Sequence, residues 1–141
     1  MTSVVTAQEV NAFYAKQFSG RGSSDQIIEV RRDYARLRQE ISDQNLRPGN
    51  YISGPTQMAL ADSAAYVAIF TRLGIVPMAV TSNLNINFLR PCLGTAVIAE
   101  ARTIKLGRTL AVIEVEIRAE GSDKLSAHAV VTYSIPTTEA A

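Results

Sequence analysis

One carboxylate stands in the middle of a strongly apolar stretch of this sequence. Residues 50–70 read NYISGPTQMALADSAAYVAIF, and Asp62 is the only charged residue among them. A carboxylate in such surroundings finds hydrogen-bond partners, lies where water reaches it, or has its pKa raised. Two interpretations stay open from the residues alone. Asp62 lies on a solvated stripe or bonds the hydroxyl of a neighbouring strand, or it acts as a general base or nucleophile.

The other side chains able to do chemistry are scattered along the chain. His128 is the only histidine and Cys92 the only cysteine, so no cluster with zinc-ligand spacing exists and no metal is expected. His128 alternates with alanines in LSAHAVV, which predicts an outward polar position on a strand. Ser53 and Ser63 lack the motif of a serine nucleophile, and a lone cysteine is more typical of packing. Asp62 is therefore the main catalytic candidate.

The element that must carry Asp62 is a long helix, predicted over residues 55–73. The turn RPGN at residues 47–50 precedes it, and Pro55 suits a first helical turn because its missing N–H needs no partner there. Gly74 is a typical residue to follow a helix. Because this helix is apolar nearly all round, other elements must cover it.

The residues before this helix predict one helix and one extended segment. Thr6 and Glu9 stand in the positions of a capping box, which predicts a helix over residues 6–18. A Gly/Ser-rich break follows it. Residues 26–41 then show apolar side chains at alternate positions, which predicts an extended segment with an irregularity near Arg32.

The residues after the long helix predict strands. Residues 79–89 alternate like a half-buried strand, with Val80, Ser82, Leu84, Ile86 and Phe88 on one face. Three further strands joined by short hairpin connections are predicted at residues 95–106, 109–119 and 125–135. Together these elements predict an α+β fold in which an antiparallel sheet wraps around one long central helix.

The composition predicts that these elements form one domain, residues 1–141. It also argues against binding to nucleic acid or to a membrane. With 47% hydrophobic residues the chain buries a substantial core. A formal net charge of +1 gives no long-range field that would attract nucleic acid or an anionic membrane. The amino terminus lacks the pattern of a signal peptide, and the apolar run ends too early for a membrane span. We therefore expect a cytoplasmic protein that binds neither nucleic acid nor membrane.

Two motifs in the sequence resemble a known family. SGPTQMALAD at residues 53–62, followed by TSNLNINFLRP at 81–91, is similar to the hotdog-fold acyl-CoA thioesterases, in particular the branch related to phenylacetic acid degradation. The resemblance covers residues 47–133. It implies a hotdog fold and an enzyme that hydrolyses an acyl-CoA thioester to the free acid and coenzyme A. The family carries a His-Gly-Gly turn and a later helix acid, and Ser53-Gly54-Pro55 and Asp62 occupy those places.

The resemblance assigns roles to three residues. It implies that the Gly54 N–H polarises the thioester carbonyl, that Asp62 attacks directly or activates water, and that the Thr81 hydroxyl orients the acid or the water. Coenzyme A is part of the substrate, and no separate cofactor is implied. Ser53 replaces the His that hotdog dehydratases pair with a helix acid, so dehydration is disfavoured, and Pro55 has no N–H to offer.

The spacing of the two main residues has a consequence for assembly. Gly54 and Asp62 are eight positions apart, which along a helix is about 12 Å. This is too far for both groups of one chain to touch the same carbonyl. A two-fold homodimer with antiparallel central helices, the assembly that the family uses, would make two equal sites. Whether dimers pair into tetramers stays open.

Seven further residues are substrate-binding candidates. Met58 and Tyr66 share the helix face of Asp62 and are candidates for the acyl chain, although core packing explains them equally well. The others are the turn residues Ser53 and Pro55, and three basic residues that could bind the phosphates of coenzyme A or be ordinary solvated charges: Arg90, Lys105 and Arg108. The altered turn also motivates an alternative function, a non-catalytic acyl-CoA-binding protein.

Overall fold

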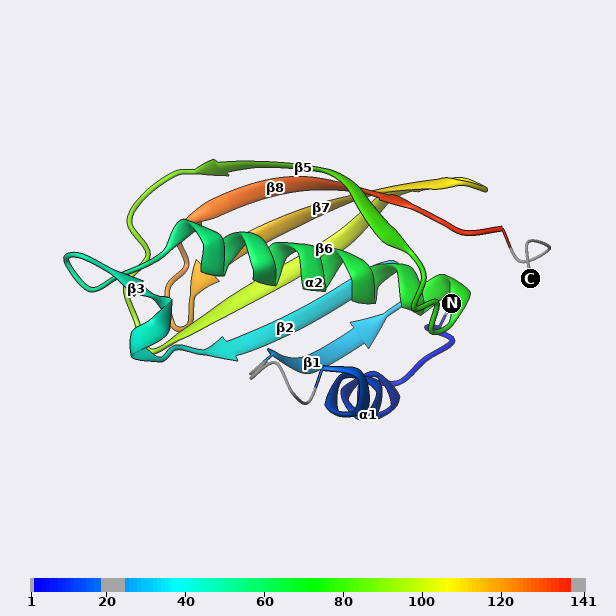
Figure 1. Cartoon of the computed structure of the whole chain (residues 1–141), viewed down its shortest axis with the longest axis horizontal. Helices are drawn as coiled ribbons and strands as arrows, with labels where there is room; N and C mark the ends of the chain where they lie inside the picture. Colours follow the sequence, from blue (N-terminus) through cyan, green and yellow to red (C-terminus); the bar gives the residue numbers. More distant parts are fainter. Residues whose placement is uncertain (1, 19–24, 138–141) are drawn as a thin grey trace.

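The computed structural model describes residues 2–18 and 25–137, and it shows an antiparallel six-stranded sheet curved around one long helix (Figure 1). The strand order in the sheet is β1-β2-β6-β7-β8-β5. This confirms the predicted α+β hotdog architecture. The elements are α1 (Ala7–Gln17), β1 (Asp25–Arg31), β2 (Tyr34–Glu40), a 3₁₀ turn (Asp43–Asn45), the short pair β3 (Leu46–Arg47) and β4 (Tyr51–Ile52), α2 (Gly54–Leu73), β5 (Val80–Phe88), β6 (Ala96–Leu106), β7 (Leu110–Ala119) and β8 (Ala127–Ser134).

Both predicted helices form where their caps place them. The Thr6 hydroxyl accepts a hydrogen bond from the Glu9 N–H at 3.1 Å, and the Glu9 carboxylate accepts one from the Thr6 N–H at 2.9 Å, which completes the capping box of α1. Gly74 ends α2 with a φ of 82°, a conformation that favours glycine. The Gly/Ser-rich break predicted after α1 lies outside the described residues.

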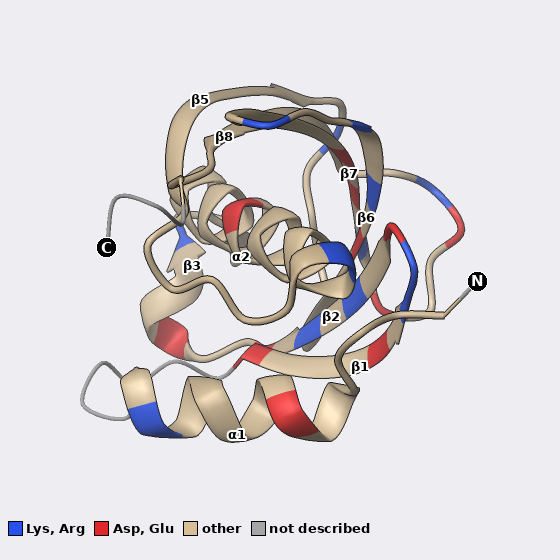
Figure 2. Ribbon diagram, turned by 90° about the vertical axis from the view of Figure 1, so that its right-hand side faces the viewer, with Lys and Arg blue, Asp and Glu red and all other residues tan. Residues whose placement is uncertain are grey.

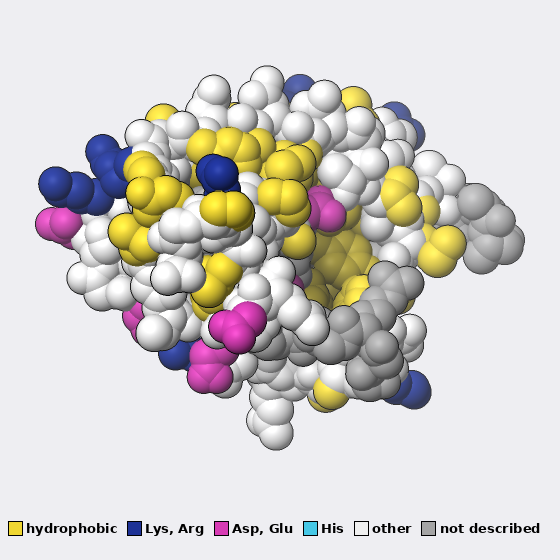
Figure 3. Space-filling model, turned by 60° about the vertical axis from the view of Figure 1, so that its left-hand side comes forward, with side chains coloured by type: hydrophobic (Ala, Val, Ile, Leu, Met, Phe, Trp, Pro, Cys, Tyr) yellow, Lys and Arg dark blue, Asp and Glu magenta, His cyan; other side chains and the backbone are white. Residues whose placement is uncertain are grey.

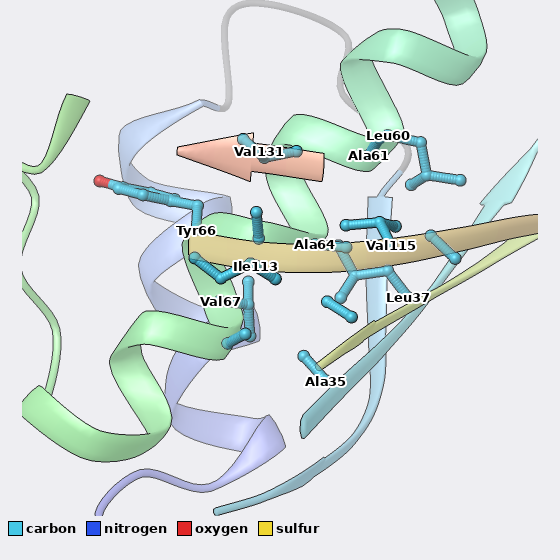
Figure 4. Packing of buried hydrophobic residues seen from close by; sticks show 14 of the residues in the cluster. Ala35, Leu37, Leu60, Ala61, Ala64, Tyr66, Val67, Ile113, Val115 and Val131 are labelled. Atoms are coloured by element: carbon cyan, nitrogen blue, oxygen red, sulfur yellow. The ribbon is translucent and has the colours of Figure 1, made fainter. Parts of the chain in front are cut away.

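The core lies between α2 and the concave face of the sheet. Leu60, Ala64 and Val67 of α2 are at most 1% exposed, and they face buried side chains of the sheet, including Leu37 and Val115 (Figure 4). Small alanines on α2 let the strands approach closely. Figure 2 shows that α2 carries few charged residues, whereas the strands carry many. The sheet thus covers the apolar helix, as its composition requires.

Residues 26–41 are largely extended, as predicted, but the irregularity expected near Arg32 is a full reversal of the chain, so they form a hairpin of two strands instead of one segment. β1 and β2 pair as antiparallel neighbours, and the chain reverses at Arg32 and Asp33, where Asp33 has a φ of 64°. The Asp33 N–H donates to the Thr71 hydroxyl of α2 at 2.9 Å, and the Arg72 guanidinium lies 3.0 Å from the Asp33 carboxylate. Contacts with a distant helix therefore hold this turn, and alternation along the segment does not reveal them.

Replacing Thr71 by Val should destabilise the fold by about 1–3 kcal/mol, because it leaves the Asp33 N–H without its acceptor. Thr71 is fully buried, and its hydroxyl also donates to the Ala68 carbonyl at 2.7 Å. Urea unfolding measures the change, with Thr71→Ser as the matched control that keeps the hydroxyl. Equal free energies of unfolding for the Val and Ser variants would contradict this explanation of the turn.

The edge strand β5 departs from the predicted half-buried pattern. Val80 is 57% exposed and Phe88 49% exposed, whereas Leu84 and Ile86 are partly buried and pack against the core. The register with β8 shifts near Ser82, between Thr81 and Asn83. Strict alternation would turn Thr81 away from the core side, and this bulge brings its side chain to α2 instead. The predicted alternation is therefore wrong at the start of the strand.

Candidate active site

Two hydroxyl groups hold the Asp62 carboxylate. The Thr81 Oγ1 donates to Asp62 Oδ1 at 2.5 Å, and the Tyr133 hydroxyl donates to the same oxygen at 3.0 Å. The Tyr133 hydroxyl also lies 3.1 Å from the Asp62 backbone carbonyl oxygen. The structure thus brings together Asp62 and Thr81, two residues singled out in the sequence. A strand hydroxyl on Asp62 agrees with both interpretations, structural and catalytic.

A cavity of about 460 Å³, here called the acid cavity, opens beside Asp62. Aromatic rings form much of its lining, and Asp62, Ser63 and Thr81 contribute polar groups. Figure 3 shows a hollow of this kind, where an acidic side chain borders a floor of hydrophobic side chains. The aromatic residues of the lining are Tyr14, Phe18, Tyr66 and Tyr133. A cavity with an apolar wall and a few polar groups is typical of a small-molecule site.

The acid cavity also contains groups that the sequence did not single out. Burial raises the pKa of Tyr133 above its ordinary range, and the nearby charge of Asp62 raises it further, so Tyr133 stays a neutral donor. Burial likewise raises the pKa of Tyr14, whose hydroxyl lies 2.5 Å from that of Ser63. A second carboxylate, Asp25, lines the cavity, and burial raises its pKa while a hydrogen bond with Ser63 lowers it.

Gly54 lies at a different cavity, at the start of α2. It is the first residue of the helix, where N–H groups have no intrahelical acceptor, and within residues 2–18 and 25–137 its N–H makes no hydrogen bond. The cavity, here called the turn cavity, has a volume of about 460 Å³ and is lined by Gly54, Phe88 and Arg90 among others. The positive end of the helix dipole faces an oxygen placed there.

The two other turn residues have structural positions. Ser53 is the N-cap of α2, and its hydroxyl accepts a hydrogen bond from the Thr56 N–H at 3.2 Å. Pro55 follows within the first turn and is exposed. Gly54 is therefore the turn residue whose N–H is available to a ligand.

The remaining candidates spread along the molecule. Tyr66 lines the acid cavity and donates to the Pro77 carbonyl at 2.9 Å, whereas Met58 is 38% exposed and lines neither cavity. Arg90 lines the turn cavity and donates to the Leu125 carbonyl at 2.7 Å. Arg108 and Lys105 lie near the other end of α2. Arg108 lines a cavity together with Leu73, the last residue of α2, and Lys105 is near the end of β6, three positions before Arg108. One chain does not bring the three basic residues together.

Of the residues set aside in the sequence, His128 lies away from both cavities, whereas Cys92 is part of the lining of the turn cavity. His128 lies on β8 between two buried alanines, 2.9 Å from the Glu114 carboxylate, as its alternation predicted. Cys92 is 2% exposed, and burial raises the pKa of its thiol. Over the described ranges, no three His, Cys, Asp or Glu side chains cluster as metal ligands would. Neither helix of residues 2–18 and 25–137 has the length and hydropathy of a membrane span.

The sequence and the fold of this chain are similar to those of proteins described as thioesterases and esterases. The family model of the thioesterase superfamily matches residues 49–126, a range that includes both Gly54 and Asp62. A crystal structure described as a "putative thioesterase" from Silicibacter sp. TM1040 is 33% identical, with a TM-score of 0.87, and the match covers 96% of this chain and 95% of that one. A "putative esterase" of Saccharolobus solfataricus is 26% identical over 94% of this chain and 87% of its own length.

A more distant structure shows the same fold with a ligand. A protein of Streptococcus mutans, solved with acetyl-CoA bound, is 20% identical with a TM-score of 0.71. The match covers 82% of this chain and 91% of that protein.

Proposed function

The chain belongs to the thioesterase superfamily and is a thioester hydrolase, and from this we propose that it hydrolyses acyl-CoA thioesters at a site shared by two subunits. The observation that carries the proposal is the Asp62 carboxylate, held by two hydroxyls beside a cavity with aromatic walls. Coenzyme A as the thiol is supported by the acetyl-CoA bound to the Streptococcus mutans relative. The branch related to phenylacetic acid degradation stays a prediction.

In the proposed reaction the thioester carbonyl oxygen accepts a hydrogen bond from the Gly54 N–H. This donor, with the positive end of α2 behind it, stabilises the negative charge that develops on the oxygen. Asp62 removes a proton from the attacking water, or attacks the carbonyl carbon itself to form an anhydride that water then hydrolyses. Both routes break the carbon–sulfur bond and release the free acid and the coenzyme A thiol. No cofactor is needed by either route.

A homodimer is part of the proposal, because Gly54 and Asp62 line different cavities of one chain. Two features support it. The sheet leaves one side of α2 uncovered, where Met58 and Ala59 are exposed and Asp62 is partly so. The neighbouring strand β5 is a sheet edge that exposes apolar side chains. A second copy packed on this surface would cover both, and a two-fold axis would place the partner's Gly54 toward Asp62.

The panel experiment that tests the proposed activity measures thiol release from phenylacetyl-, benzoyl- and straight-chain acyl-CoA by the wild-type protein. We expect turnover of at least one member, and its identity tests the predicted branch. The molar mass in solution, from light scattering, should be that of a dimer or a dimer of dimers. Binding of acyl-CoA without release of thiol would instead support the non-catalytic alternative.

Replacing Tyr66 by Ala should change the acyl preference more than the overall rate. The Tyr66 ring lies 5.8 Å from the Tyr133 ring and forms part of the wall of the acid cavity. Removing it enlarges the cavity, so we expect the ratio of kcat/KM between long or bulky and short acyl groups to rise about tenfold. The same acyl-CoA panel measures this ratio. Unchanged relative rates would show that Tyr66 does not shape the acyl preference.

A further inference from the structure

We infer that Tyr133 is a positioning residue for Asp62 in the proposed hydrolysis. Its hydroxyl holds the carboxylate in one orientation, in which Asp62 Oδ2 points toward the water or the thioester carbonyl carbon. The inference rests on the proposed function. Tyr133 is 3% exposed and belongs to β8, the strand next to β5. Its hydroxyl is the second donor to Asp62 Oδ1, beside that of Thr81.

The sheet delivers both hydroxyls to the same point. Thr81 and Tyr133 are direct partners in the antiparallel pairing of β5 and β8, so their side chains stand side by side on one face. The register shift that follows Thr81 turns this face toward α2. Two donors from two strands therefore meet one helix carboxylate, and the bulge in β5 is what makes the meeting possible.

The two hydroxyl groups donate hydrogen bonds to only one of the two carboxylate oxygens of Asp62. Asp62 Oδ1 accepts from both Thr81 and Tyr133, whereas no described side chain or backbone group donates to Oδ2. The contact of the Tyr133 hydroxyl with the Asp62 carbonyl oxygen ties the side chain to its own backbone. Such a carboxylate cannot exchange its oxygens freely, so Oδ2 is the atom that takes the proton from water or attacks the carbonyl carbon.

The surroundings of Tyr133 suit this role. Its ring stacks on that of Tyr66, with an angle of 23° between the planes, which fixes where the hydroxyl lies. Burial and the charge of Asp62 raise the pKa of Tyr133, so the hydroxyl remains a donor across the pH range in which a hydrolase is assayed. Thr81 is exposed in the single chain, whereas Tyr133 is buried, so the Tyr133 contact is the one that the single chain already shields from water.

The variant Tyr133→Phe tests the inference, because it keeps the ring and removes only the hydroxyl. We expect kcat for the best substrate of the panel to fall about tenfold while KM stays within about twofold. The matched control is Tyr34→Phe, which removes a buried tyrosine hydroxyl that donates to the Glu100 carboxylate at 2.6 Å, on a strand away from both cavities. Its kcat should equal that of the wild type.

A second measurement separates positioning from general stability. In the Asp62→Asn background, Tyr133→Phe should lower the residual activity less than twofold, because the group it positions is gone. Loss of the same factor in both backgrounds would overturn the inference, as would a Tyr133→Phe kcat equal to that of Tyr34→Phe. Absence of thiol release by the wild-type protein is a distinct result that would overturn the proposed function and, with it, this inference.

Discussion

The Asp62→Asn variant is expected to release coenzyme A about a thousandfold more slowly than the wild type, because an amide neither accepts a proton from water nor attacks a carbonyl carbon. Its oxygen can still accept the hydrogen bonds that Thr81 and Tyr133 donate to Asp62 Oδ1. The fold and the shape of the cavity should therefore persist. Initial rates of thiol release under saturating substrate measure the change in kcat, and thermal unfolding and light scattering check that the variant is folded and assembled.

The matched control for this change is Asp123→Asn, the same substitution at an exposed position between β7 and β8. It should leave kcat and KM as in the wild type. If Asp62→Asn retained more than about a tenth of the wild-type kcat, the carboxylate would have a structural role and the hydrolysis would need another base.

The second large effect is expected at Gly54, where one substitution removes the proposed donor and another keeps it. Gly54→Pro deletes the backbone N–H, and proline is well tolerated at the first position of a helix. Gly54→Ala adds a similar Cβ but retains the N–H. Loss of one donor to a developing oxyanion costs about 10²–10³ in kcat. We therefore expect a loss of that size for Gly54→Pro alone.

The comparison of the two Gly54 variants isolates the N–H from crowding. A Cβ at this position would lie 3.2 Å from the edge of the Phe88 ring, a contact that the half-exposed ring can relieve by a small shift. Both variants carry this crowding, and only Gly54→Pro lacks the donor. Equal kcat values for the two variants would show that the carbonyl is polarised by another group.

Much of the fold follows from local patterns in the sequence. The capping box of α1, Pro55 in the first turn of α2 and Gly74 at its end are local signals, and the structure confirms the helices that they predict. The alternation in the last three strands is equally direct, because each strand has one face on the core. The catalytic roles of Asp62 and Gly54 are implied by the resemblance of the helix acid and the turn to the family, and they stay predictions.

What the sequence did not predict depends on contacts between distant residues. The turn at Asp33 is held by Thr71 and Arg72, which lie almost forty positions away. The meeting of Tyr133 with Asp62 depends on the pairing register of two strands and on a bulge in one of them. One signal was available: Tyr133 alternates with the buried Val131, so it had to face the helix, and its hydroxyl then needed a partner there.

The most direct test of the shared site mixes two variants that are each inactive alone. Equal amounts of Asp62→Asn and Gly54→Pro are dissociated and allowed to reassemble, so that half of the dimers are hybrids. Each hybrid has one site with both intact groups and one site with neither, so we predict a return to about one quarter of the wild-type activity per subunit. Activity that stays at the level of the separate variants, in a mixture shown to contain hybrids, would contradict a site built from Gly54 of one subunit and Asp62 of the other.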